Sequence, residues 1–373
     1  MTNLNIAYQR MHNQLITQPS LAKPGDVVRW LGAVQAQDYA GAKWALGVRL
    51  QNATDNDIEQ AFADGTILRT HLLRPTWHFV SRDDIRWILA LTAPRVNAAI
   101  AYYYRKLELD DATFSRSNAL LENALRDGKQ LTRSELLAIF EQAGIATNDL
   151  RLSHIIMHAE LDMLICSGAR RGKQFTYALL DERAPDAKML ERNDALAELT
   201  RRYFTSRGPV TLEDFVWWSG LTMSDARAGI EMVRSEFIHE VIDNKTYWFS
   251  SSMPIAKDAS PTMTHLLPPY DEYTIAYKDR SAVLDSAHIV QTRNGIFSPI
   301  IVVDGQIVGT WTRTFKKNTV LIETSLFTPL NESETRAISA SANRYGAFLD
   351  MPQPYVTYSS PSFSSTKSDN LRM

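Results

Sequence analysis

Two glutamines separated by one alanine are the residues of this chain whose types and spacing first suggest chemistry. Gln35 and Gln37 lie in the segment Val-Gln-Ala-Gln-Asp (34–38), at the end of a predicted helix and within an otherwise apolar stretch. Glutamine is disfavoured in protein interiors unless hydrogen bonds satisfy its amide. Its carboxamide has both a donor and an acceptor, so it can orient a water molecule without titrating. Taken alone, however, the pair favours ordinary polar residues at a helix end.

Other patterns in the sequence point away from metal and nucleophilic catalysis. His154 and His158 are spaced i, i+4, but the glutamate of a zinc-protease helix is missing, so we interpret them as paired histidines on one helix face. No Gly-x-Ser-x-Gly turn and no glycine loop followed by a helix occurs. The single cysteine, Cys166, lies in an apolar run and is predicted to be a buried thiol. We therefore expect no metal and no cofactor.

Composition sets limits on the class of protein. The 373 residues are 45% hydrophobic, which is enough for one large core or two to three small ones. No window approaches 18 uninterrupted apolar residues and the N-terminus has no apolar signal region, so we expect no membrane partner and a cytoplasmic location. With 40 basic and 42 acidic residues, the net charge of −2 favours no particular partner.

The order of predicted elements in residues 1–81 is typical of a winged helix-turn-helix unit. Apolar residues at helical spacing predict several helices, after which the period changes from 3.6 to 2 and predicts a two-stranded hairpin. Thr54 and Asp57 provide an N-cap for the last of these helices. The predicted helices are 4–17, 23–37, 41–50 and 54–63, and the hairpin strands are 67–71 and 76–80.

The same pattern recurs twice, which predicts a second unit at 128–185 and a third at 186–252. In the second unit, Thr132 and Glu135 form a capping box, Gly144 ends the first helix, and the next helix covers about 149–167. Residues 82–127, between the first two units, are predicted to be helical scaffold. The remaining predicted elements are a strand at 174–180, a helix near 222–235, and a hairpin of strands 237–243 and 245–249 that turns at Asp243-Asn244.

Strand patterns dominate residues 253–358. A tight Asp304-Gly305 turn joins two of the strands. The predicted strands are 273–277, 299–303, 307–314, 320–327 and 355–358, and one helix is predicted at 332–349. The serine-rich tail, 359–373, is predicted to be disordered. The fold class is therefore α+β, with three tandem winged helix-turn-helix units, a helical scaffold and a C-terminal β-rich domain.

Several segments, in the same order, resemble the AlkZ/YcaQ family of winged-helix DNA glycosylases. The Gln-Ala-Gln segment is similar to the glutamine–apolar–glutamine catalytic motif of the AlkZ-like branch, whereas the YcaQ branch carries aspartate at the second position. Gln37 is therefore taken as the counterpart of that position, in preference to Asp38. The other matching segments are RTHLLRPTWH (69–78), APRV (93–96), RGPVT (207–211), WWSGL (217–221), LLPPYDEY (266–273), DR (279–280) and VDGQIVGTW (303–311).

This resemblance implies a monofunctional DNA glycosylase that removes alkylated purines. Alkylation at guanine N7 or adenine N3 makes the base cationic, so that it departs nearly neutral and needs little general-acid help. What remains is to hold a water molecule against C1′ and to stabilise the sugar cation. We expect Gln37 to position that water, and Gln35 to fix Gln37 or contact the sugar–phosphate backbone. The family also processes bulky adducts and interstrand crosslinks.

The expected partner is double-stranded DNA with alkylated purines, bound by a monomer. The predicted wings supply the contacts to phosphate and to the lesion, although core packing for Trp77 and a solvated turn for the second wing remain open. Asp271 and Glu272 are interpreted as structural residues at the start of a strand. The residues predicted to contact DNA are Arg69, His71, Arg74, Trp77, His78, Arg170, Arg171 and Lys173.

Two alternatives share this architecture. A non-catalytic winged-helix DNA-binding protein, such as a transcription regulator, would keep Gln35 and Gln37 as bystanders. A protein-interaction module would show no salt-sensitive binding to duplex DNA.

Overall fold

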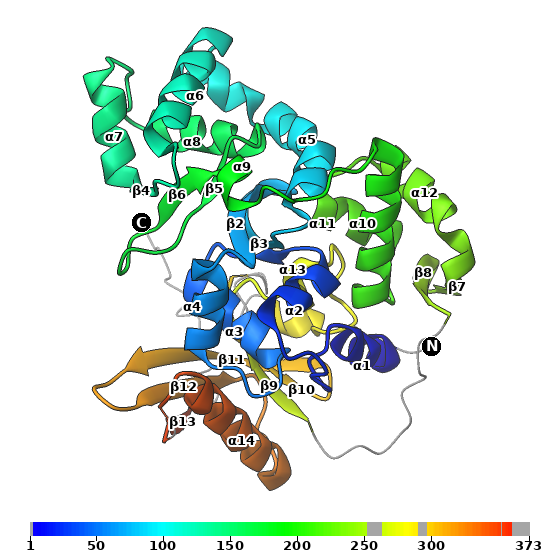
Figure 1. The fold of residues 1–373 in the computed structure, drawn as a ribbon. Helices are drawn as coiled ribbons and strands as arrows, with labels where there is room; N and C mark the ends of the chain where they lie inside the picture. Colours follow the sequence, from blue (N-terminus) through cyan, green and yellow to red (C-terminus); the bar gives the residue numbers. More distant parts are fainter. Residues whose placement is uncertain (1–2, 252–262, 290–296, 352, 360–373) are drawn as a thin grey trace, which may run out of the picture.

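The computed structural model describes residues 3–251, 263–289, 297–351 and 353–359, which form a mixed α+β structure (Figure 1). After an N-terminal helix, the chain forms a helix, a short strand, two helices and a hairpin, and the three strands make a sheet of order β1-β3-β2. The predicted hairpin and the predicted N-cap at Thr54 are both confirmed, and Thr54 and Asp57 together form a capping box. The elements are α1 (Asn3–Asn13), α2 (Pro24–Leu31), β1 (Val34–Gln35), α3 (Tyr39–Val48), α4 (Asp55–Ala63), β2 (Ile67–Leu72) and β3 (Arg74–Ser81).

The order helix, short strand, two helices and hairpin recurs in the next part of the chain. A long helix, α5 (Ile85–Lys106), connects it to the first part, and its own sheet has the order β4-β6-β5. The predicted capping box of Thr132 and Glu135 is confirmed at the start of α7. The elements are α6 (Asp111–Leu125), β4 (Leu131–Thr132), α7 (Arg133–Gln142), α8 (Arg151–Leu161), β5 (Ile165–Ser167), β6 (Thr176–Leu179) and α9 (Leu180–Arg183).

A third set of elements follows the same order, with an isolated bridge between Val210 and Trp248 in the place of the short strand. The predicted hairpin turns at Asp243-Asn244, where both residues have positive φ, as a two-residue type I′ turn requires. The elements are α10 (Arg192–Arg207), α11 (Leu212–Ser219), α12 (Met223–Met232), a 3₁₀ turn (Arg234–Glu236), β7 (Phe237–Ile242) and β8 (Lys245–Ser250).

The C-terminal part contains a five-stranded sheet of order β13-β12-β11-β10-β9, in which only β12 and β13 are parallel. The helix α14 packs beside this sheet (Figure 1). The predicted tail lies almost wholly outside the described residues. The elements are β9 (Thr264–Leu267), α13 (Glu272–Ile275), a 3₁₀ turn (Ser286–His288), β10 (Ile300–Val303), β11 (Gln306–Phe315), β12 (Val320–Leu326), α14 (Glu332–Phe348) and β13 (Tyr355–Ser359).

The first set of elements and the C-terminal sheet share one hydrophobic core. Trp44 of α3 packs against Tyr345 and Phe348 of α14, with ring centroids 4.9 and 5.0 Å apart. The indole N–H of Trp44 donates to the Leu266 carbonyl of β9 at 2.7 Å. This shared core includes Val34 and Ala36, the apolar neighbours of the two glutamines, so both sets of elements support the glutamine motif.

Two element predictions for the second and the C-terminal parts of the chain are wrong. Residues 273–277 were expected to form a strand, but Asp271 caps the short helix α13 there, with its side chain accepting from the Tyr273 N–H at 2.8 Å. The helix expected at 149–167 ends at Leu161, and Met163, with φ of 60°, turns the chain into β5. Asp271 and Glu272 therefore begin a helix and not a strand.

Three further features of the described residues concern Cys166, clusters of metal-ligating side chains and membrane-spanning helices. Cys166 is buried as predicted, and burial raises the pKa of its thiol to about 12. Across the described ranges, no group of three or more His, Cys, Asp or Glu side chains lies together as metal ligands would. None of the helices in the described part of the chain is both long enough and apolar enough to cross a bilayer.

Candidate active site

The glutamine motif lies on a strand and the loop after it, and not at a helix end as predicted. Helix α2 stops at Leu31 because Gly32 adopts φ of 74°, a conformation that side-chain-bearing residues rarely take. The chain then enters β1, where Gln35 pairs with His78 of β3 in antiparallel register. Gln35 is 8% exposed, whereas Gln37 is exposed. The motif therefore presents one buried and one accessible amide.

Three distant segments hold the backbone of the motif. The Gln35 N–H donates to Oε1 of Glu272 at 3.0 Å. The Ala36 N–H donates to the carbonyl of Trp77 at 2.7 Å, and the Ala36 carbonyl accepts from Nε of Arg69 at 3.1 Å. The backbone N–H of Gln35 and the backbone N–H and carbonyl of Ala36 therefore all have hydrogen-bond partners. These bonds fix the backbone of the motif before any substrate arrives.

The two amide side chains are held to different degrees. Oε1 of Gln35 accepts from Nη2 of Arg74 at 3.0 Å, and Nη1 of Arg74 is tied to the Trp217 carbonyl at 3.2 Å. Among the described residues, Oε1 of Gln37 accepts from the Trp77 N–H alone, at 3.4 Å. A bond of that length is weak. Gln35 is therefore locked, and Gln37 can exchange its contact for a water molecule or a ligand.

A buried ion pair lies beneath the motif. Glu272 and Arg207 are both fully buried, and Glu272 Oε2 accepts from Arg207 Nη2 at 2.6 Å and from the Trp218 indole N–H at 3.0 Å. Arg207 also donates to the carbonyls of Leu31 and Ala33, at 2.7 and 3.1 Å. The pair thus clamps the chain on both sides of the turn that leads into the motif.

The other carboxylates near the motif are also engaged. Oδ1 of Asp38 accepts from the Gly41 N–H at 2.7 Å and caps α3, and it lies 3.9 Å from Nη2 of Arg313. Asp271 is fully buried and receives two hydrogen bonds from Arg49, at 2.8 and 2.9 Å. Neither Asp38 nor Asp271 therefore has the freedom expected of a general base.

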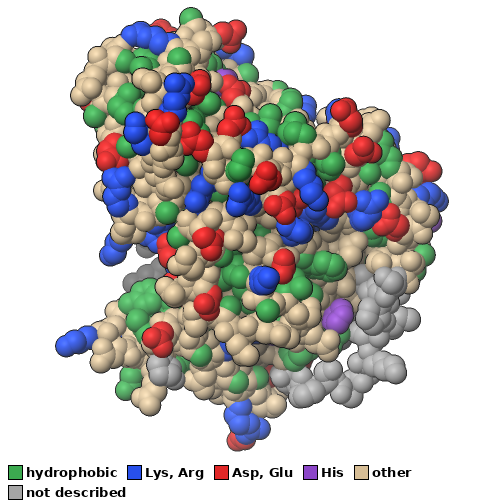
Figure 2. Space-filling model, viewed as in Figure 1, with side chains coloured by type: hydrophobic (Ala, Val, Ile, Leu, Met, Phe, Trp, Pro, Cys, Tyr) green, Lys and Arg blue, Asp and Glu red, His purple; other side chains and the backbone are tan. Residues whose placement is uncertain are grey.

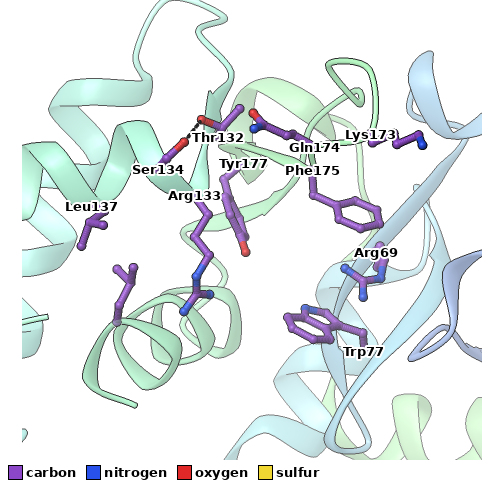
Figure 3. Close-up of a pocket in the computed structure, with 11 residues that line it drawn as sticks. Arg69, Trp77, Thr132, Arg133, Ser134, Leu137, Lys173, Gln174, Phe175 and Tyr177 are labelled. Carbon is purple, nitrogen blue, oxygen red and sulfur yellow. Dashed lines mark hydrogen bonds between the residues drawn. The ribbon is translucent and has the colours of Figure 1, made fainter. Parts of the chain in front are cut away.

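A cleft opens beside the motif, between the β2–β3 hairpin and the elements α7, α8 and β6 (Figure 3). Its volume is about 530 Å³. Cationic and aromatic side chains line it, and Trp77, which touches Gln37 through its backbone, forms part of its wall. Figure 2 shows a notch in the outline of the molecule between the part that contains α6–α8 and the part that contains β11 and β12, with Lys and Arg side chains at its upper rim.

Comparison with known proteins identifies the family. Residues 28–348 match the family model described as DNA glycosylase AlkZ-like. The chain belongs to the AlkZ-like DNA glycosylase family. The interstrand DNA cross-link repair glycosylase of Streptomyces sahachiroi is 24% identical over 327 residues, which cover 81% of this chain and 85% of that protein. The solved structure of Streptomyces sahachiroi DNA glycosylase AlkZ superposes with a TM-score of 0.80 at 20% identity, covering 96% of this chain and 100% of the other.

In this AlkZ-like glycosylase, the residues predicted for the first wing differ in accessibility. Arg69 is mostly buried, with its guanidinium 4.3 Å from the Trp77 ring and 4.5 Å from the Phe175 ring, and burial lowers its pKa to about 10. His71 is also buried, and its Nδ1 is hydrogen-bonded to Glu160. His78 is fully buried, with Nδ1 2.9 Å from the Thr76 carbonyl, and burial holds its pKa well below the usual value. Neither histidine presents its ring to solvent.

The residues predicted for the second wing lie on the loop between β5 and β6. Arg170 is half-buried, pairs with Glu59 at 3.1 Å and covers the ring of Tyr39 at 4.8 Å. Arg171 is exposed and pairs with Glu135 at 2.7 Å. Lys173 is exposed at the edge of the cleft. Of the three, Lys173 is the cation whose described surroundings include no carboxylate partner.

The family member contains functional groups that sequence reasoning missed. Arg207 and Trp218 lie in segments that had been recognised as family-like, but neither had been assigned a role, and Glu272 had been interpreted as structural. The available signal was a glutamate and an arginine within largely apolar surroundings. Their pairing spans 65 positions, so nothing local in the sequence connects them.

Proposed function

We propose that this chain hydrolyses the N-glycosidic bond of cationic alkylated purines in double-stranded DNA, with N7-alkylguanine as the principal substrate. The proposed reaction uses a water molecule positioned by Gln37 and needs neither a metal ion nor a cofactor. The observation that carries the proposal is the arrangement of the motif itself. An accessible, weakly held amide lies beside a buried and locked one, and the neighbouring carboxylates are occupied.

The chemistry matches this arrangement. A base that already carries positive charge leaves nearly neutral, and the bond breaks through an oxocarbenium-like state of the kind known for glycoside hydrolysis. The protein then has to hold water within about 2.6–3.2 Å of its amide and limit its motion. Gln37 Oε1 accepts a hydrogen bond from that water when it releases the Trp77 N–H, while Gln35, fixed by Arg74, supplies a donor to the sugar–phosphate backbone.

We further propose that the three recurring sets of elements are winged helices that together bind the duplex. In such units a helix enters the major groove and the hairpin reaches the backbone. Accessibility limits the proposed contacts to Arg74, Trp77, Arg171 and Lys173, with Arg69 and Arg170 supporting aromatic rings behind the surface. The buried His71 and His78 support the wing from inside. One chain carries all three units, so we propose that it acts as a monomer.

The class of lesion is also part of the proposal. The relative from Streptomyces sahachiroi is named for repair of interstrand cross-links, and the cleft beside the motif is open rather than enclosed. An open site suits a lesion that is joined to both strands, because such a lesion cannot be extruded into an enclosed pocket as ordinary flipped bases are. We propose that bulky N7-adducts and interstrand crosslinks are substrates alongside simple N7-methylguanine.

The test is excision of N7-methylguanine from duplex DNA, followed by hot alkali to cleave the abasic sites. We expect Gln37→Ala to slow excision by about 100-fold, a magnitude typical for the loss of a group that acts in the transition state. The matched control is Gln60→Ala, an exposed glutamine on α4 outside the site. Full activity of Gln37→Ala would refute the proposal that Gln37 positions the attacking water. An inactive wild type that still binds duplex DNA would favour a non-catalytic DNA-binding protein.

A further inference from the structure

One exposed tryptophan is linked directly to the glutamine motif. Trp217, in the last turn of α11, is 41% exposed, whereas its neighbour Trp218 is fully buried. The Trp217 carbonyl accepts from Nη1 of Arg74, and Nη2 of the same guanidinium donates to Gln35. An isolated exposed ring needs no explanation by itself, so the way in which this one is held decides its meaning.

The short helix α13 fixes the orientation of the ring. The indole N–H of Trp217 donates to the carbonyl of Ile275 at 2.9 Å. Nε of Arg280 donates to the carbonyl of Thr274, also at 2.9 Å. Both carbonyls lie at the C-terminal end of α13, where the helix itself provides no N–H to satisfy them. Glu272, at the other end of α13, holds the backbone of the glutamine motif, so one helix orients both the motif and the exposed ring.

Close backbone packing holds α11 against the β2–β3 hairpin. Gly220 caps the end of α11 with φ of 71°. A Cβ at this position would lie 2.3 Å from the carbonyl oxygen of Leu73, in the turn of the hairpin, so a larger residue would force the two backbones apart. The ring is therefore carried on an element that is fixed relative to the hairpin, and a partner would spend little conformational entropy on ordering it.

The ring and the cleft lie on opposite faces of the three-stranded sheet. Arg74 and Trp77 are three positions apart on β3, and successive side chains of a strand point to opposite faces. Arg74 leads to Trp217, whereas Trp77 lines the cleft. The motif, which begins on the edge strand β1, therefore has one tryptophan on each side.

Positive charge surrounds the exposed ring. The guanidinium of Arg280 lies 5.7 Å from the ring centroid, and Arg74 is bound to the carbonyl of the same residue. Burial lowers the pKa of both arginines, and for Arg280 the nearby Asp214 offsets part of this lowering while Arg74 adds to it. Neither guanidinium forms an ion pair with a carboxylate of the described residues, so an approaching anion gains from both charges. An aromatic ring flanked by cations suits nucleic acid, in which phosphates lie beside flat bases.

We propose that Trp217 is a second DNA contact of the motif and stacks on the nucleotide that flanks the lesion in the damaged strand. Arg74 and Arg280 face the phosphates of that nucleotide. An apolar side chain that enters a base step partly unstacks it, which loosens the damaged base from its neighbour. The contact also fixes the register of the strand, so that the sugar of the damaged nucleotide stays at Gln37. The inference rests on the proposed function, because it places a damaged nucleotide at Gln37.

The test is a double-mutant cycle between the protein and the DNA. The duplex contains 2′-fluoro-7-methylguanine, because the fluorine destabilises the sugar cation and so protects the base from excision during the measurement. The nucleotides on either side of it are intact in one duplex and are replaced in turn by tetrahydrofuran, which lacks a base, in two others. Fluorescence anisotropy gives the dissociation constant of each duplex for wild type, Trp217→Ala and Trp217→Phe. The control is Tyr102→Ala, which removes a ring that is 60% exposed on α5.

The affinities should depend on the ring and on the flanking base together. We expect Trp217→Ala to weaken binding of the intact duplex by about 5- to 100-fold, the usual effect of losing a base–aromatic stack. This loss should shrink to about twofold or less on the duplex that lacks the stacked base, because the ring then has no base to contact. Trp217→Phe keeps a flat ring and should bind within about threefold of wild type. Tyr102→Ala should leave all affinities unchanged.

Three results would overturn the stacking contact. The first is binding by Trp217→Ala as tight as that of wild type. The second is a loss of equal size on all the duplexes, because the ring would then support the fold or touch only the backbone. The third is Trp217→Phe binding as weakly as Trp217→Ala, because the indole N–H bond to Ile275 and not the ring would then be responsible.

Excision of ordinary 7-methylguanine, measured in parallel, separates this inference from the proposed function. A wild type that binds the duplexes but excises nothing would refute the proposed function and leave the stacking result standing. A wild type that excises 7-methylguanine while Trp217→Ala binds normally would overturn the stacking contact alone. A wild type that neither binds nor excises would refute both.

Discussion

The substitution Glu272→Gln tests whether the buried ion pair positions the motif or only supports the fold. Glu272 accepts from the Gln35 N–H, from Arg207 and from the Trp218 indole, all within the fully buried interior. Glutamine has nearly the same shape as glutamate, but it replaces one acceptor oxygen with a donor and leaves Arg207 without its counterion. The substitution therefore separates the charge from the packing.

The substitution should have two effects, a loss of folding stability and a slower excision reaction. Removing one partner of a buried ion pair costs about 3–5 kcal/mol, which is a large part of the roughly 5–15 kcal/mol that stabilises most domains. A hydrogen bond to a charged group contributes about 1.5–3 kcal/mol. If the loss of the bond at Gln35 appears fully in the activation barrier, excision slows by about 10- to 100-fold.

The neighbouring residue provides a matched control. Asp271 forms an equally buried pair with Arg49, but it makes no contact with the motif. Urea unfolding should show that Glu272→Gln and Asp271→Asn lose similar stability. Single-turnover excision of N7-methylguanine, measured where both variants are folded, should be slow only for Glu272→Gln. The dissociation constant for duplex DNA should be unchanged in both.

Two results would refute this reasoning. If Asp271→Asn slows excision as much as Glu272→Gln, the effect comes from general loosening of the buried interior and not from the contact with Gln35. If Glu272→Gln loses stability and still excises at the wild-type rate, the motif holds its geometry without the carboxylate.

Two further predictions concern pH. Carboxamides do not titrate and His78 stays neutral, so we expect the excision rate to vary by no more than about twofold between about pH 6.5 and 8.5; a bell-shaped profile would instead indicate a titrating acid or base. Stability should behave differently, because burial lowers the pKa of His265 to about 4. The unfolded chain takes up this proton below its usual pKa near 6.5 and the folded protein does not, so stability is complete above about pH 6.5 and falls by roughly 3 kcal/mol as the pH approaches 4. Urea unfolding of wild type and His265→Gln at about pH 7 and 4.5 measures this loss, and equal losses in both proteins would contradict it.

Features set by residues within a few positions of one another were predicted correctly from the sequence. The N-cap at Thr54 and the capping box at Thr132 form as expected, because a hydroxyl and a carboxylate three residues apart satisfy the same helix terminus. The Asp304-Gly305 turn also forms, with both residues at positive φ. In each case the deciding interaction is local.

Errors arose where tertiary burial overrides the local pattern. The sequence Tyr-Thr-Ile-Ala-Tyr (273–277) alternates like a strand, yet all five side chains are buried, so the alternation does not distinguish two faces. The helical cap from Asp271 then decides the conformation. Similarly, Gly32 ends α2 before the glutamines, which places Gln35 on a strand.

For the candidate site, the sequence identified the two amides but not their surroundings. Family resemblance pointed to Gln35 and Gln37, whereas composition and spacing alone favoured ordinary polar residues. The accessibility of the wing residues was not predictable, because alternation along β2 does not reveal that α8 covers His71 through Glu160. The clamp of Arg207 and Glu272 depends on segments that meet only in the folded protein.

The distance along the chain between Gln35 and its carboxylate partner has a consequence for biosynthesis. The partner lies 237 positions downstream, so at ordinary translation speeds a ribosome delivers it roughly 10–50 s after Gln35 has emerged. Until then the Gln35 N–H lacks its carboxylate acceptor, Glu272, even if the elements around the motif have begun to fold. If the proposed mechanism holds, a chain that ends before Glu272 lacks the carboxylate that holds Gln35, and we expect it to excise damaged bases poorly.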